Sequence, residues 1–100
     1  MNVIEVGAGL VFRKGKLLIT QRRPQDHLGG LWEFPGGKRE AAESFEDCLV
    51  RELREELGIE AEIGEEAARA RHTYDFGEIE LIALFVKSYT GEPKDRKSVV

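Results

Sequence analysis

The hydrophobic pattern begins with two short runs typical of β-strands. Residues 3–12 and 17–21 are apolar and rich in β-branched side chains. The four residues between them form a polar turn in which Gly15 can take a positive φ. The pattern therefore predicts a β-hairpin over residues 3–21. Gly7 and Gly9 within the first run indicate either a β-bulge or a close approach of another part of the backbone.

The next segment is broken by proline and glycine. Pro24 ends the second strand because it cannot donate to a ladder, and residues 25–30 form a polar loop. Residues 31–34 predict a brief strand. Pro35-Gly36-Gly37 predicts a tight turn, and residues 38–43 lead as a loop into the next element.

A helical period follows over residues 44–57. Ser44 is a suitable N-cap, and Gly58 stands where a helix-ending glycine belongs. At about 100° per residue the apolar side chains form one stripe, which predicts the buried face of the helix: Leu49, Val50, Leu53 and Leu57.

The last third of the chain returns to a strand pattern. Residues 59–71 predict a strand that frays near Gly64, residues 72–76 predict extended structure, and Gly77 turns the chain. Residues 79–89 are almost continuously apolar, which is typical of a strand covered on both faces. One helix cannot supply both layers, so the other face needs a second sheet or helix, or another protomer. Residues 94–100 predict no element.

Composition limits the classes of function. One hundred residues make a single domain, 1–100. The start lacks the basic region of a signal peptide, and no apolar run is long enough to span a membrane. A single cysteine, Cys48, cannot form an internal disulfide, so we expect a cytoplasmic protein. The net charge of −4 speaks against duplex nucleic acid as a partner.

The helix places three acids where they are unfavourable. Glu52, Glu55 and Glu56 lie in its C-terminal half, next to the apolar stripe. The helix dipole disfavours an acid there by roughly 0.3–1 kcal/mol, and neighbouring like charges repel further. Such a departure from local rules is typical of a functional site. A divalent cation with oxygen ligands would compensate for it.

The helix and its flanks resemble the Nudix box. The pattern of that family, GX5EX7REUXEEXGU with U apolar, is filled at every specified position from Gly37 to Ile59. The upstream segment ITQRRPQDHLGGLWEFPGGK also resembles the MutT-like branch, which includes 8-oxo-dGTP and other NTP pyrophosphohydrolases. The resemblance covers about residues 3–92.

The resemblance implies a fold and an activity. It implies an α/β/α sandwich with a mixed sheet. It also implies Mg²⁺-dependent hydrolysis, with Mn²⁺ as an alternative ion, of nucleoside triphosphates to nucleoside monophosphate and pyrophosphate. Oxidised purine nucleotides would be among the substrates, and the role would be sanitation of the nucleotide pool, a branch of DNA repair. Phosphoryl transfer depends mainly on charge neutralisation and a positioned water.

The resemblance also implies site residues. Glu52 matches the general base, and Arg51 matches an arginine that orients a neighbouring glutamate; Glu43 matches a secondary metal position. The metal ligands would be the Gly36 carbonyl and Glu52, Glu55 and Glu56. Substrate contacts are implied for Arg22, His27, Glu33, Phe34, Pro35 and Gly36.

Each of these residues has a simpler interpretation. Arg51 could only pair with Glu55 or Asp47 along the helix. Arg22 and His27 could be ordinary loop residues. Aromatic residues are more often core than stacking platforms, which applies to Trp32, Tyr74, Phe76 and Phe85. Tyr74 or Phe76 is the best stacking candidate.

The chain departs from the family in its tail. MutT-like domains usually run about thirty residues further, into another strand and a long helix. We therefore expect the C-terminal strand and helix to be absent. Two alternatives stay open: hydrolysis of another linked diphosphate, such as a dinucleoside polyphosphate, and a truncated binding-only module, with a homodimer covering the exposed sheet.

Overall fold

The structure, a computed structural model, describes residues 2–21, 24–25, 30–93 and 97–98. One helix and eight strands are found in these residues. They are β1 Val3–Leu10, β2 Phe12–Arg13, β3 Lys16–Gln21, β4 Trp32–Glu33, β5 Gly36–Lys38, α1 Phe45–Leu57, β6 Glu60–Tyr74, β7 Gly77–Thr90 and β8 Lys97–Ser98.

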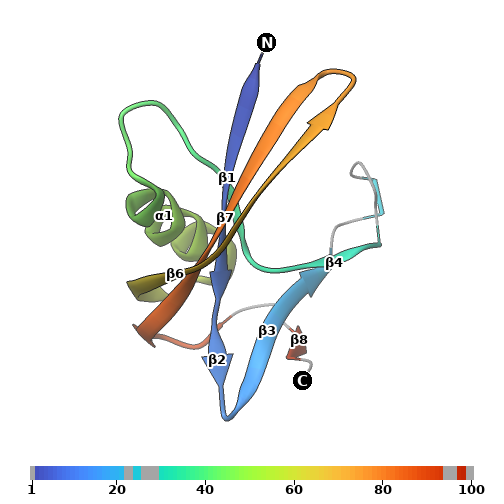
Figure 1. Cartoon of the computed structure of the whole chain (residues 1–100). Coiled ribbons are helices and arrows are strands. Elements are labelled where there is room, and N and C mark those ends of the chain that lie inside the picture. Colours follow the sequence, from blue (N-terminus) through green and yellow to red (C-terminus); the bar gives the residue numbers. More distant parts are fainter. Residues whose placement is uncertain (1, 22–23, 26–29, 94–96, 99–100) are drawn as a thin grey trace.

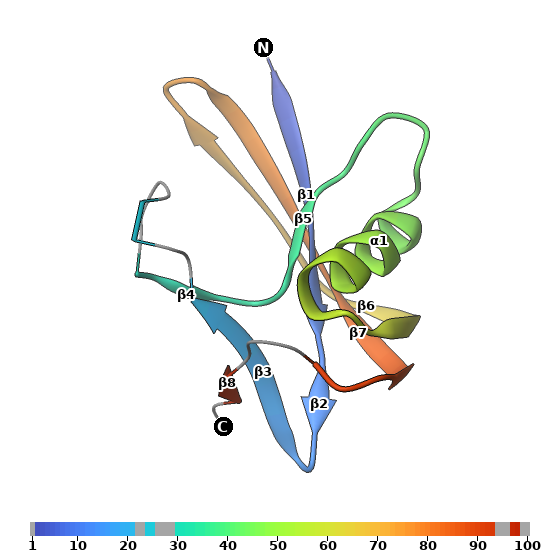
Figure 2. The same ribbon diagram turned by 180° about the vertical axis from the view of Figure 1, so that it is seen from behind.

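The larger sheet is mixed. Its strand order is β5-β1-β7-β6; Figure 1 labels β1, β7 and β6, and Figure 2 labels β5 beside β1. Strands β1 and β7 are parallel, with Val6 beside Leu81, whereas β5 and β6 join antiparallel. Parallel neighbours need a long connection, and here it contains α1. The predicted α/β fold with a mixed sheet is therefore confirmed.

The predicted hairpin over residues 3–21 is only partly correct. Strands β2 and β3 do form a hairpin, and Gly15 has the expected positive φ of 75°. The longer β1 instead joins the other sheet. Val11 lies between β1 and β2 and is fully buried, so the chain changes sheets at a core residue. A second sheet has the order β2-β3-β4, and β8 pairs with β3, where no element was expected.

Helix α1 lies across one face of the larger sheet (Figure 2). It has the predicted ends: the Ser44 hydroxyl accepts from the Asp47 N–H at 3.0 Å, and Gly58 takes the left-handed conformation. Gly7 and Gly9 of β1 face the helix, as their close approach predicted. The buried core combines the helix with both sheets: Val11, Leu18, Leu49, Leu53, Leu57, Ile59, Ile82 and Leu84. Val50, which was predicted on the buried face, is only half-buried.

The tight turn predicted at residues 35–37 is wrong. Gly36 and Gly37 instead begin β5, which pairs antiparallel with β1. The φ of Gly36 is 153°, and a side chain there would collide with the Gly7 carbonyl oxygen. The glycines therefore allow β5 to lie tightly against β1. Two successive glycines after a proline had predicted a turn instead.

Strands β6 and β7 form a long hairpin that turns at residues 75–76 (Figure 1). The predicted fraying near Gly64 is wrong, because β6 continues through register shifts between residues 62 and 68. Only one face of β7 is buried. Ile82 and Leu84 face the core, whereas Leu81 is 39% exposed and Phe85 is 41% exposed. The prediction that both faces of this strand are covered is therefore wrong for the described residues. The face that carries Leu81 and Phe85 is apolar but remains exposed.

The four aromatic residues expected in the core are all exposed in part. Tyr74 and Phe76 stack on each other near the hairpin tip, with ring centroids 5.2 Å apart. Trp32 and Phe85 are also accessible. Within the described part of the chain, no helix is both long and apolar enough to span a membrane.

Candidate functional site

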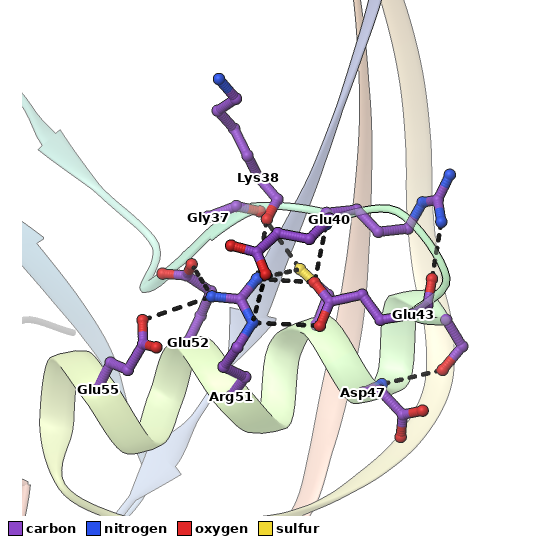
Figure 3. Close-up of polar contacts among 11 residues, drawn as sticks. Gly37, Lys38, Glu40, Glu43, Asp47, Arg51, Glu52 and Glu55 are labelled. Atoms are coloured by element: carbon purple, nitrogen blue, oxygen red, sulfur yellow. Dashed lines mark hydrogen bonds and ion pairs between the residues drawn. The ribbon is translucent and has the colours of Figure 1, made fainter.

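Arg51 is the centre of a cluster of carboxylates on the side of α1 that faces β5. Its guanidinium donates to Glu43 at 2.7 and 3.1 Å, to Glu52 at 2.8 Å and to Glu55 at 3.4 Å. In Figure 3 it lies between Glu43 and Glu52. A further bond of 3.1 Å reaches the Lys38 carbonyl. Arg51 thus ties the helix to β5 and orients its neighbouring glutamates.

This arrangement partly compensates for the unfavourable acids of the helix. The simpler interpretation gave Arg51 one helical partner, but its strongest contacts are with Glu43 and Glu52. Four carboxylates, those of Glu40, Glu43, Glu52 and Glu55, lie within 4.0 Å of one guanidinium. One positive charge cannot neutralise four negative ones, so the cluster keeps an excess of negative charge.

Glu43 is the most strongly held member of the cluster. Hydrogen bonds from Arg51, and then from the Glu40 N–H at 2.8 Å, lower the pKa of Glu43 from 4.5 to about 2. The hydrogen bonds of Arg51 to Glu43, and then to Glu52, raise the pKa of Arg51 in turn. Both groups are therefore charged at any pH near neutrality.

Cys48 lies beneath this cluster and was given no role from the sequence. It is fully buried, and its thiol contacts the Gly37 carbonyl at 3.6 Å. Burial raises the pKa of the Cys48 thiol to about 11. It is therefore a protonated packing group in the core rather than a nucleophile.

Glu52 lies directly against β5. A side chain at Gly37 would collide with the Glu52 carboxylate, so this glycine leaves the space that the carboxylate occupies. Glu52 is also largely shielded, with 19% of its side chain exposed, whereas 61% of Glu55 is exposed. Glu56 lies one position further on and is half-buried.

The donor set fits a hard cation. Carboxylates of Glu52, Glu55 and Glu56 and the main-chain carbonyl of Gly36 offer only oxygen atoms, as Mg²⁺ prefers. Among the residues that the structure places, no three His, Cys, Asp or Glu side chains converge enough to hold a metal by themselves. Mg²⁺ commonly uses only one or two carboxylates and completes its shell with phosphate and water, so the donors are sufficient for an ion shared with a phosphorylated ligand.

A cavity of about 490 Å³ adjoins the cluster. This volume is within the range of about 300–1,000 Å³ for small-molecule sites. Its walls come from β1, β3, β4, β5 and β7, and are formed by Val6, Gly7, Ala8, Ile19, Trp32, Glu33, Phe34, Gly36, Gly37, Lys38 and Leu81. The cavity is thus largely apolar, with Lys38 and Glu33 as its charged side chains.

The predicted substrate residues are only partly gathered at this cavity. Glu33, Phe34 and Gly36 line it. Pro35 is fully buried behind it, and its carbonyl accepts from the Gly9 N–H at 2.8 Å. Arg22 and His27 lie outside the described residues. Tyr74 and Phe76, the stacking candidates, are not among the lining residues, whereas Trp32, expected in the core, is.

Known proteins resemble the chain over nearly its whole length. It matches the NUDIX domain family over residues 1–99. A CTP pyrophosphohydrolase of Escherichia coli (strain K12) is 48% identical over 91 residues, which cover 91% of this chain and 67% of that protein. An 8-oxo-dGTP diphosphatase of Proteus vulgaris is 35% identical, covering 94% and 85% of the two chains.

Solved structures agree in fold. The solution structure of the E. coli ORF135 protein has a TM-score of 0.85 and 44% identity, covering 100% of this chain and 71% of that chain. A MutT NUDIX hydrolase from Burkholderia pseudomallei has a TM-score of 0.82 at 24% identity, which is a likeness of fold. Together with the complete box from Gly37 to Ile59, these matches show that the chain belongs to the NUDIX domain family, with MutT-like relatives, and is a Nudix hydrolase.

Proposed function

We propose that the chain hydrolyses nucleoside triphosphates to nucleoside monophosphate and pyrophosphate with the help of Mg²⁺. One observation carries the proposal: Gly37 belongs both to the wall of the cavity and to the contact with the Glu52 carboxylate. A nucleoside triphosphate whose nucleoside lies in the cavity would therefore place its phosphates beside the acidic edge of α1, which is formed by Glu52, Glu55 and Glu56. Mn²⁺ is the alternative ion.

In this proposal the acidic edge holds the cation. Glu52, Glu55, Glu56 and the Gly36 carbonyl would hold the ion with oxygen ligands, and the bound ion would supply charge neutralisation for the phosphates and acidity to a water ligand. The excess of negative charge around Arg51 supports this assignment. Glu43 acts on the cation site only through Arg51, because its carboxylate is bound to the Arg51 guanidinium rather than turned toward Glu52.

Glu52 is the proposed general base. It accepts a proton as the water oxygen bonds to the α- or β-phosphorus and the bond from that phosphorus to the α–β bridging oxygen breaks; the bridging oxygen and its electron pair stay with the leaving group, which is pyrophosphate after attack at the α-phosphorus and the monophosphate after attack at the β-phosphorus. Arg51 is a positioning residue, since its 2.8 Å bond fixes the Glu52 carboxylate. Attack at either phosphorus gives the same products. Labelled water distinguishes the two, because its oxygen appears in the monophosphate or in the pyrophosphate.

The cavity is the proposed nucleoside site. Trp32 and Phe34 offer accessible aromatic surface on its wall, and base stacking on an aromatic side chain contributes about 1–3 kcal/mol. The names of the relatives suggest two substrate classes, CTP and 8-oxo-dGTP. Either class fits a role in sanitising the nucleotide pool, and through it in DNA repair.

A nucleotide panel tests the proposal. Pyrophosphate release is measured with the canonical ribo- and deoxynucleoside triphosphates and with oxidised purine triphosphates, with Mg²⁺, with Mn²⁺ and with EDTA. We expect turnover of at least one triphosphate that stops in EDTA, with monophosphate and pyrophosphate as products. A folded protein that turns over none of them would refute the proposal.

Hydrolysis of dinucleoside polyphosphates is less well supported. Enzymes of that kind tend to carry a tyrosine after the box, and Tyr74 lies close to that position. That residue stacks on Phe76 near the hairpin tip and does not line the cavity. Including diadenosine polyphosphates in the panel tests this alternative directly.

The open face of β7 supports a proposal about partners. Leu81 belongs to the cavity wall, but Phe85 exposes apolar surface on β7 outside the cavity, and such surface favours association. A homodimer that covers β7 around Phe85, in the cytoplasm and without duplex nucleic acid, is the proposed state. Light scattering tests it: a mass twice 11.3 kDa is expected, and a stable monomer would contradict it. A dimer without turnover would instead favour the binding-only module.

A further inference from the structure

Arg39 binds the loop between β5 and α1 to both of its neighbours. Its main-chain N–H donates to the Glu5 carbonyl of β1 at 2.7 Å, and its guanidinium pairs with the Glu5 carboxylate. The same guanidinium donates to the main-chain carbonyl of Glu43 at 2.7 Å. It also lies 5.5 Å from the ring centroid of Phe45, within the range of a cation–π contact.

These contacts continue to Glu52 through two intermediate residues, Glu43 and Arg51. Arg39 fixes the main chain of Glu43, and the Glu43 carboxylate accepts two bonds from Arg51. Arg51 then donates to Glu52 at 2.8 Å. A displacement of Glu43 would release Arg51, and with it the carboxylate proposed as the base.

The loop needs such support because its backbone is strained. Ala42, one residue before Glu43, has a φ of 70°. An L-residue in the left-handed region costs roughly 1–2 kcal/mol and persists where its surroundings hold it. Arg39 also tolerates a buried Nε–H for which the described residues offer no acceptor. An unfavourable backbone and an unfavourable side-chain burial therefore meet in one short loop.

We propose that Arg39, paired with Glu5, is a positioning residue. It holds Glu43 and Arg51 in the arrangement that orients the Glu52 carboxylate for hydrolysis. It occupies a variable position of the Nudix box, between the glycine and the first glutamate, so the box pattern assigns it no part. The inference rests on the proposed function for its kinetic consequence only. The arrangement itself can be observed without substrate.

The test compares Arg39→Met, Arg39→Lys and Glu5→Gln with a matched control. Arg69→Met removes an arginine that pairs with Glu66 on the exposed part of β6. For Arg39→Met we expect kcat to fall by about 10-fold, as for other supporting contacts around a metal site, with KM nearly unchanged. Arg39→Lys and Glu5→Gln should retain part of the activity, because each keeps some of the contacts. Arg69→Met should behave as the wild type.

A substrate-free readout separates this inference from the proposed function. The Nε–H of Arg51 donates to Glu43 at 3.1 Å, and NMR can follow its exchange with water. Faster exchange in Arg39→Met and Glu5→Gln, but not in Arg69→Met, supports the inference even if no nucleotide is hydrolysed. Unchanged exchange, or unchanged kcat in an active protein, would overturn it. Should Arg39→Met fail to fold, Arg39→Lys and Glu5→Gln decide.

Discussion

The Glu52 carboxylate occupies the space that a side chain at Gly37 would need. This contact joins β5 to α1 at the place where the cavity meets the acidic edge. Any residue larger than glycine must displace the proposed base.

We predict that Gly37→Ala abolishes most activity but changes the free energy of unfolding only slightly, because the atoms it displaces are the end of the flexible Glu52 side chain. Gly64→Ala is the matched control, because an added methyl group there meets only ordinary contacts, the nearest at 3.4 Å. Steady-state kinetics and chemical denaturation measure the two effects. Full activity in Gly37→Ala would show that the position of Glu52 is not critical.

Trp32 should bind the nucleobase. Trp32→Ala removes an aromatic side chain from the cavity wall, so we expect KM to rise by about 5- to 150-fold, which corresponds to a stacking energy of about 1–3 kcal/mol. Phe12→Ala is the control, because Phe12 is 51% exposed but does not line the cavity. An equal KM for the two variants would argue against the cavity as the nucleoside site.

Ala42 stores strain that glycine would release. Its φ of 70° is unfavourable for alanine but accessible to glycine. Ala42→Gly should therefore raise the free energy of unfolding by up to about 1 kcal/mol, as measured by chemical denaturation. Ala41→Gly, next to it and without a positive φ, should instead lower it. Destabilisation by both changes would show that the loop is not strained at Ala42.

Glu43 makes stability depend on pH. Its pKa falls from 4.5 to about 2, chiefly through the hydrogen bonds from Arg51, so the folded state favours its carboxylate. This contribution is complete above pH 4.5, declines as the pH falls toward 2 and is absent below it. The difference in unfolding free energy between the wild type and Glu43→Gln should shrink over this range. A difference that stays constant from pH 7 to pH 2 would contradict the account.

Local signals in the sequence predicted the helix well. Ser44 and Gly58 mark its ends, and the leucines at four-residue spacing mark its buried face, because each depends on neighbours within a turn. The acidic edge was visible for the same reason. Its partners were harder to see: the bonds from Arg51 to Glu43 and Lys38 depend on where the loop returns.

Features that depend on strand pairing escaped sequence reading. Gly36 was predicted in a turn, yet it belongs to a strand. Strand β1 accepts this strand closely because Gly7 of β1 pairs with Gly37. Trp32 was expected in the core, yet it borders a cavity whose lining residues come from strands of both sheets, and a single local segment does not reveal such a site. The ion pair between Arg39 and Glu5 joins residues that are 34 positions apart in the sequence. A local sequence pattern cannot predict such a pair.

The most direct test of the proposed metal-dependent hydrolysis is a Mg²⁺ titration of pyrophosphate release by the wild type, Glu52→Gln and Glu56→Gln. Glu46→Gln, an exposed acid of the first helical turn, is the matched control. We predict that Glu52→Gln and Glu56→Gln lose about 100-fold or more in kcat, with helical content unchanged, while Glu46→Gln keeps the wild-type response. Wild-type turnover and Mg²⁺ dependence in Glu52→Gln and Glu56→Gln would contradict the assignment of the acidic edge as the catalytic metal site.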